Sequence, residues 1–192
     1  MPDIPQAPPQ RERLIARLPF FYGWVVLGAG TLGVIMSIPG QTVGVSVFTD
    51  FLLEALGLER LQLSLAYLLG TLGSAALLSF AGRLYDRWGA RVLGIAAVLI
   101  LGAALMNLSA VGPSAGGLGA FAAITVSFFV LRFAGQGVLT MVSRNMVMKW
   151  FDRRRGLANA FLGVATSFGF SYAPRLLDGF IESWGWRGAF RM

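Results

Sequence analysis

Three long stretches of this sequence contain no Asp, Glu, Lys or Arg. They cover residues 20–49, 61–82 and 92–131. A helix needs about 20 apolar residues to cross the roughly 30 Å hydrocarbon core of a bilayer, and each stretch is at least that long. The chain is 56% hydrophobic and only 13% charged, about half the charged fraction of an ordinary soluble domain. We therefore expect an all-α, polytopic membrane helical bundle, because the runs lack the alternation that a membrane β-barrel requires.

Turn residues and charged linkers divide the apolar sequence into five expected spans. A Pro-rich polar tail, residues 1–18, precedes them, and its composition predicts disorder. The glycine-rich stretch 112–117 divides the longest run into two helices. Pro39-Gly40 is expected to bend or break the first span. The expected spans cover residues 19–48, 61–82, 92–112, 118–142 and 156–177.

Basic residues gather on one side of the expected bundle. With the N-terminus inside, eleven Lys and Arg residues lie on the cytoplasmic side and three on the other. The positive-inside rule therefore predicts a multi-pass protein of the inner (plasma) membrane with a cytoplasmic N-terminus. It also accounts for the net charge of +7 by contact with the lipid bilayer, without a nucleic-acid partner. The eleven residues are Arg11, Arg13, Arg17, Arg83, Arg87, Arg91, Arg144, Lys149, Arg153, Arg154 and Arg155.

Several kinds of chemistry lack their usual residues. The chain has no Cys and no His, which excludes disulfides, thiol nucleophiles and imidazole acid–base catalysis. The expected spans 19–48, 61–82, 92–112 and 118–142 contain no Asp or Glu. We expect no enzyme activity, no metal site and no cofactor.

A compact polar segment separates the second and third expected spans. Its pattern, G-x-L-x-D-R-x-G-x-R, and its position in a cytoplasmic loop resemble the signature loop of the major facilitator superfamily. Ala90 stands where that family often has a basic residue. The resemblance implies that this loop latches the outward-facing state, whereas the arginines alone would only set the topology. The residues of the expected latch are Gly82, Leu84, Asp86, Arg87, Gly89 and Arg91.

Other segments are similar to motifs of the same superfamily. Arg132, Gln136 and Gly137 match an R-x-x-x-Q-G motif of its fourth helix. Trp150–Ala160 and Phe20–Trp24 resemble motifs of the monocarboxylate and oxalate/formate antiporter branch. Residues 184–192 resemble the start of a sixth helix. The resemblance implies the N-terminal portion, about five spans, of a twelve-helix carrier, with the C-terminal half missing from this chain because it is a fragment or a truncated product.

Arg132 is the most unusual residue within the expected spans. An arginine at the bilayer centre costs about 2.5–3.5 kcal/mol on insertion scales. We expect it either to face a polar cavity, where it binds a carboxylate or relays protons, or to bond backbone carbonyls between helices. Gln41 and Arg175 complete the candidate substrate pathway, although Arg175 could instead reach the outer surface. The first-helix lysine of animal monocarboxylate carriers is absent.

The sequence therefore predicts secondary active transport by alternating access. The expected substrate is a small organic anion such as a monocarboxylate, coupled to protons or to a second anion. Two alternatives stay open. The chain belongs either to a carrier for another substrate class, such as drugs or sugars, or to an accessory membrane protein that does not transport.

Overall fold

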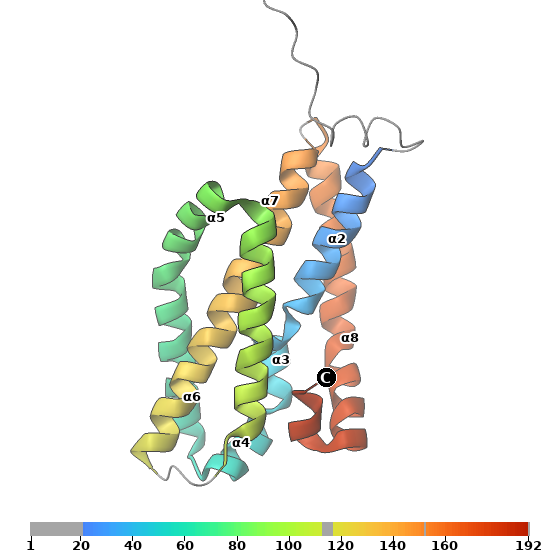
Figure 1. The fold of residues 1–192 in the computed structure, drawn as a ribbon. Coiled ribbons are helices and arrows are strands. Elements are labelled where there is room, and N and C mark those ends of the chain that lie inside the picture. Colours follow the sequence, from blue (N-terminus) through green and yellow to red (C-terminus); the bar gives the residue numbers. More distant parts are fainter. Residues whose placement is uncertain (1–20, 113–116, 152, 192) are drawn as a thin grey trace, which may run out of the picture.

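The structure is a computed structural model that describes residues 21–112, 117–151 and 153–191. Its elements are helices, and the described residues contain no strand. Figure 1 shows them standing side by side as a bundle. The expected all-α class is confirmed. The expected disordered tail, residues 1–18, lies outside the described residues.

The first apolar run forms a broken helix. Helix α2 covers Gly23–Met36 and is followed by a short 3-10 turn, η1, at Ile38–Gly40. Helix α3 then covers Thr42–Val47, and α4 covers Thr49–Leu56. The break lies at Pro39-Gly40, as the sequence predicts, because proline lacks the N–H group that a continuing helix would use. Gln41 is extended, and it separates the two halves.

Helix α5, Arg60–Ala110, is a hairpin rather than one rod. Gly89 has φ 80° and ψ 171°, which interrupts the helical backbone. In Figure 1 the two arms run in opposite directions and meet at the top. The segment 82–91, which was expected to be a loop, is therefore helical on both sides of a break at Gly89. Glycine tolerates a positive φ that other residues rarely adopt, so it can reverse the chain here without a longer loop.

The remaining apolar sequence forms two long helical units. Helix α6 covers Leu118–Leu131, a π-helical segment, η3, covers Arg132–Leu139, and α7 covers Thr140–Trp150. This unit continues past residue 142, where the fourth span was expected to end. Helix α8 covers Arg155–Ala189, contains Pro174 and breaks at Gly185, where φ is 69°.

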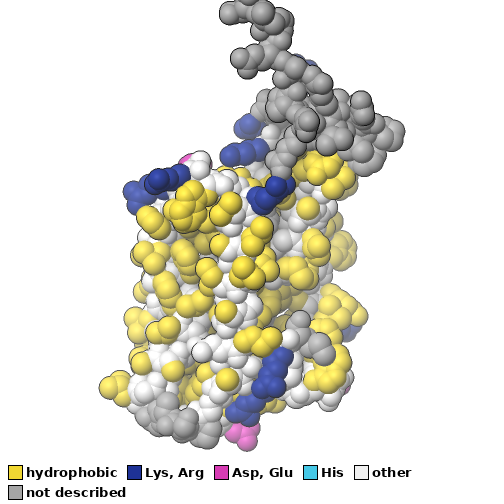
Figure 2. Space-filling view, in the orientation of Figure 1, with side chains coloured by type: hydrophobic (Ala, Val, Ile, Leu, Met, Phe, Trp, Pro, Cys, Tyr) yellow, Lys and Arg dark blue, Asp and Glu magenta, His cyan; other side chains and the backbone are white. Residues whose placement is uncertain are grey.

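Two of the described helical stretches are long and apolar enough to cross a membrane, namely Arg60–Ala110 and Leu118–Trp150. The expected count of five spans therefore stays a prediction. Large apolar side chains cover the outside of the bundle (Figure 2), and Leu99 is 68% exposed. Such a surface is unfavourable in water and suited to lipid.

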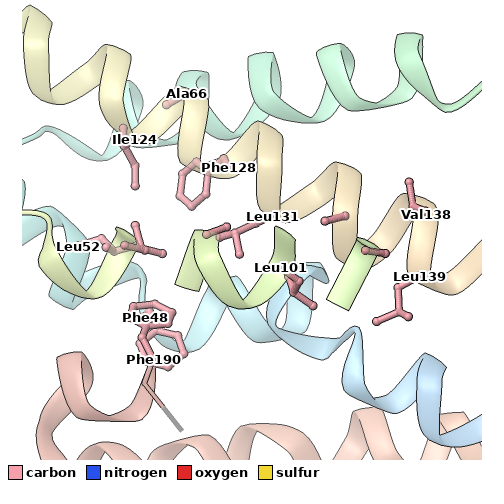
Figure 3. Packing of buried hydrophobic residues seen from close by; sticks show 14 of the residues in the cluster. Phe48, Leu52, Ala66, Leu101, Ile124, Phe128, Leu131, Val138, Leu139 and Phe190 are labelled. Atoms are coloured by element: carbon pink, nitrogen blue, oxygen red, sulfur yellow. The ribbon is translucent and has the colours of Figure 1, made fainter. Parts of the chain in front are cut away.

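The main apolar core lies between α5, α6 and η3. Figure 3 shows Phe128, Leu131 and Leu101 among the side chains of this core. At one end of this core, Phe48 and Phe190 stack with ring centroids 4.0 Å apart. This contact attaches the end of α8 to the beginning of α4.

Candidate substrate site

The π-helical segment η3 begins at Arg132 and lies inside the bundle. A π-helical turn admits one more residue than an α-helical turn, and such segments occur frequently at functional sites. Arg132 is only 6% exposed, although its side chain carries a permanent charge. The segment therefore places a buried cation inside the bundle.

Two neighbouring side chains hold the guanidinium group of Arg132. Its Nη1 donates a hydrogen bond to Oγ1 of Thr42 over 3.2 Å. Its Cζ lies 4.9 Å from the centre of the Tyr67 ring, which is a cation–π contact. The hydroxyl groups of Tyr67 and Thr42 are hydrogen-bonded at 2.8 Å. Arg132, Thr42 and Tyr67 thus form a closed polar cluster from η3, α3 and α5, which we call the arginine cluster.

The charge of Arg132 has no acidic partner among the described residues. The ion pair that the described residues do form joins Arg60 to Asp50 at 2.8 Å, and both of its side chains are exposed. The Nε atom of Arg132 is buried and makes no hydrogen bond within the described part of the chain. A buried cation with an unused donor is costly, and an anionic group would supply the missing charge and the missing acceptor.

A second polar cluster lies at the break of the first helix. Nε2 of Gln41 donates to Oγ of Ser37 over 2.9 Å and to Oγ1 of Thr140 over 3.3 Å. Oγ1 of Thr140 lies 3.1 Å from Oγ of Ser37. Ser37, Gln41 and Thr140 therefore connect the broken first helix to the start of α7. Gln41 follows Gly40 and precedes Thr42 in the chain, so the two clusters are adjacent.

The two irregular segments η1 and η3 touch through their backbones. A Cβ atom added to Gly40 would clash with the carbonyl oxygen of Leu131 and would lie 2.9 Å from Cα of Gly135. A Cβ atom added to Gly135 would lie 3.0 Å from Cα of Gly40. Only glycine at both positions permits this approach, which brings Thr42 within reach of Arg132.

The other expected pathway and motif residues lie outside the arginine cluster. Gln136 is exposed and makes no hydrogen bond to a described residue, and Gly137 packs closely against Leu78 of α5. Arg175 is exposed on α8 and has no described partner, including Asp178. Of the candidate pathway residues, the structure therefore brings together Arg132 and Gln41, through Thr42.

Sequence reasoning missed Tyr67, Ser37 and Thr140. Each is one of several hydroxyl residues in its apolar run, and such residues are common in membrane helices. Tyr67 is the only tyrosine in the expected second span, which is a weak signal for a polar site. Its partners are distant in sequence and cannot be found from local pattern.

The expected latch segment lies at the opposite end of the bundle from α4. Asp86, Arg87 and Arg91 are exposed, and no ion pair joins them to described residues. Leu84 packs against the main core. Tyr85, between these positions, is buried, and Nζ of Lys149 lies 4.7 Å above its ring. This cation–π contact attaches the segment to the last turn of α7.

The two segments that resemble branch motifs meet at the same end. Phe21 and Phe151 make an edge contact with centroids 5.5 Å apart, and Tyr22 lies 5.2 Å from Trp150. Trp24 also contacts Phe151, at 5.9 Å. The start of α2 and the junction between α7 and α8 are therefore packed through aromatic rings. Exposed basic side chains surround this end in Figure 2.

Comparison with known families agrees with this architecture. A family model described as the Major Facilitator Superfamily matches residues 30–192. The chain belongs to the Major Facilitator Superfamily. This is a family of membrane transporters, and the match includes both polar clusters and the signature segment. Comparisons with curated proteins and with solved structures give no match.

The superfamily membership gives the buried arginine a functional context. Intramembrane charges in membrane proteins are rare, and they mark substrate, ion or proton pathways. Irregular helix segments are tolerated at membrane depth where they are enclosed by protein or line a cavity. Both features coincide at η1 and η3. The arginine cluster is therefore the candidate substrate site of this transporter chain.

Proposed function

We propose that this chain provides one half of the transport pathway of a secondary carrier for small organic anions, with monocarboxylates as the substrate class. The carrier lies in the plasma membrane with its N-terminus in the cytoplasm. It works together with a second six-helix half, and the signature segment latches the outward-facing state. Transport is coupled to protons or to a second anion.

The observation that carries the proposal is the buried, uncompensated charge of Arg132. A carboxylate would accept hydrogen bonds from the guanidinium group in a planar, two-point geometry, which is stronger than a bond between neutral groups. It would also neutralise the charge in a region of low dielectric constant, where Coulomb attraction is weakly screened. A sugar or another neutral solute would leave the charge uncompensated.

The arginine cluster is closed in this conformation. Arg132 is 6% exposed, whereas Thr42 is exposed and Tyr67 is half-buried. A substrate arriving from the side of Thr42 would meet the Thr42–Tyr67 hydrogen bond before it reached the guanidinium group. Separation of these two hydroxyl groups would expose Nη1 and would let the carboxylate replace Thr42 as its acceptor.

Uptake of labelled solutes into proteoliposomes tests the proposal. The full-length protein that contains this chain is reconstituted, and uptake of radiolabelled lactate, formate and oxalate is followed with and without a pH gradient. We expect saturable uptake of at least one carboxylate that unlabelled carboxylates inhibit. Uptake of only a labelled sugar or a cationic drug would contradict the substrate class and would leave superfamily membership intact. Absence of transport, with a stoichiometric protein partner co-purifying, would favour an accessory role.

A further inference from the structure

A pocket of about 340 Å³ lies at the basic end of the bundle. The start of α2, the end of α7 and the start of α8 form it. Its apolar wall consists of aromatic rings from Phe21, Trp24, Trp150 and Phe151. Phe151 packs edge to face against Phe21 and Trp24, and Trp150 packs against Tyr22, so the wall is fixed by the helix contacts and does not need to form around a ligand.

Two arginines form the polar side of the same pocket. Arg153 and Arg154 are exposed, and no salt bridge joins them to another described residue. The sequence from 149 to 155 contains four basic residues and one acid, Asp152, whose placement lies outside the described residues. The pocket therefore carries a net positive charge and attracts an anionic group.

An exposed apolar surface leads away from the pocket along α8. Leu157 lines the pocket and is 50% exposed, and Phe161, one turn further on, is 53% exposed. The ring of Phe161 lies 6.2 Å from that of Trp24, so α2 and α8 share this surface. A ligand that filled the site completely would have an anionic head and a long apolar tail.

We propose that this pocket binds an anionic phospholipid of the leaflet that faces the basic end of the bundle. The phosphate group pairs with Arg153 and Arg154, and one acyl chain lies along Leu157 and Phe161. The two tryptophans place the pocket at the depth of the headgroups, because indole rings favour the membrane–water interface. Basic residues near a membrane surface attract anionic lipids, with about a fivefold gain in affinity for each residue.

The chain's own N-terminal tail is a poorer occupant. Residues 1–18 contain three arginines against Asp3 and Glu12, so the tail carries a net positive charge and is repelled by Arg153 and Arg154. A free phosphate ion would pair with the arginines but would leave the aromatic wall and the apolar surface of α8 uncovered. A phospholipid would pair with the arginines and would also cover the aromatic wall and the apolar surface of α8.

Quenching of tryptophan fluorescence by brominated lipids tests the proposal. Replacing Trp88, Trp184 and Trp186 with Phe leaves the two pocket tryptophans, Trp24 and Trp150, as reporters. The chain is reconstituted in phosphatidylcholine vesicles that contain a minor fraction of either brominated phosphatidylglycerol or brominated phosphatidylcholine. We expect brominated phosphatidylglycerol to occupy the pocket with roughly 25-fold preference over brominated phosphatidylcholine, about fivefold for each of the two arginines.

Variants and a soluble competitor identify the source of the preference. The double variant Arg153→Gln/Arg154→Gln is expected to lose it, whereas Arg83→Gln/Arg91→Gln, which removes the same charge elsewhere on the basic end, is expected to keep it. Soluble glycerol phosphate is expected not to displace the lipid. Equal quenching by both lipids in the unmodified pocket would overturn the proposal, and this comparison does not depend on the folding of any arginine variant. Equal loss in both double variants, or displacement by glycerol phosphate, would also overturn it.

Discussion

At the scale of single residues, the arginine cluster combines stabilising contacts with an unfavourable charge. The ring of Tyr67 and the hydroxyl group of Thr42 each contact the guanidinium group of Arg132, while its Nε atom has no described partner. Such an arrangement is a poor choice for stability alone, because a neutral side chain would avoid the cost of burying a charge. It is suited to a site whose missing partner arrives as substrate.

The hydrogen bond between Thr42 and Tyr67 predicts a measurable coupling between these residues. Thr42→Val should lower the free energy of unfolding in detergent more than Tyr67→Phe does, because Thr42 bonds both Tyr67 and Arg132. Each lost hydrogen bond is worth about 0.5–1.5 kcal/mol. The double variant should be less destabilised than the sum of the single variants. Strictly additive effects would show that the two hydroxyl groups do not interact.

At the scale of elements, the break in the first helix and the π-helical segment fit each other. Pro39 and Gly40 lie in η1, which follows the end of α2 at Met36, and Gly135 of η3 lies against Gly40. The closeness of the two backbones depends on the absence of side chains at Gly40 and Gly135. Gly163 of α8 has no such neighbour, because a Cβ atom added there meets nothing within 4 Å.

This contrast predicts opposite effects of one substitution at two positions. Gly40→Ala should lower the free energy of unfolding by about 1–3 kcal/mol, because the new methyl group meets the backbone of η3. Gly163→Ala should raise it by about 0.5–1 kcal/mol, because alanine is the better helix former and the space is open. Chemical unfolding in detergent, followed by circular dichroism, measures both. A Gly40→Ala protein as stable as the parent would contradict the close backbone packing.

The two glycines of the signature segment are expected to differ for a different reason. Gly89 has a positive φ, whereas Gly82 lies within the helical arm, and neither position is crowded. Gly89→Ala should therefore cost about 1–3 kcal/mol of backbone strain, while Gly82→Ala should be neutral or slightly stabilising. The same unfolding measurement applies. Equal effects of the two alanine substitutions on stability would mean that the hairpin does not need a residue with positive φ at position 89.

At the scale of the whole molecule, features that depend on local chemistry could be predicted from the sequence, whereas features that depend on contacts between distant segments could not. The charge-free runs predict the helical class, and Pro39-Gly40 predicts the first break, because both depend on local chemistry. Arg132 is found because a charge in an apolar run is conspicuous. The π-helical geometry of η3 has no local signal. Tyr67 and Thr140 were missed because their partners come from distant helices. The signature segment was expected to be a loop. Its chain reversal at the single residue Gly89 could not be predicted, because it depends on how the two arms pack.

The proposed latch role of Asp86 predicts an effect on the transport cycle and none on the stability of this chain. Asp86 is exposed and unpaired among the described residues, so Asp86→Asn should not change the stability of this chain. In the full-length carrier, loss of a charge at a helix terminus is worth up to about 2 kcal/mol, which shifts a two-state population by up to about thirtyfold. A cysteine introduced at the basic end of the bundle reports the shift, because the chain has no native cysteine. Unchanged labelling and unchanged turnover would leave Asp86 as a determinant of topology only.

The proposed transport depends on binding of the substrate carboxylate by Arg132. Equilibrium binding of a radiolabelled monocarboxylate to the purified full-length protein tests it most directly, with Arg132→Gln, Arg132→Lys and Arg83→Gln compared. We predict that Arg132→Gln loses at least tenfold in affinity, that Arg132→Lys retains part of it, and that Arg83→Gln, at an exposed site, is unchanged. Arg132→Gln should remain at least as stable as the parent, because it removes an uncompensated buried charge. Unaltered carboxylate binding by a folded Arg132→Gln protein would contradict the claim.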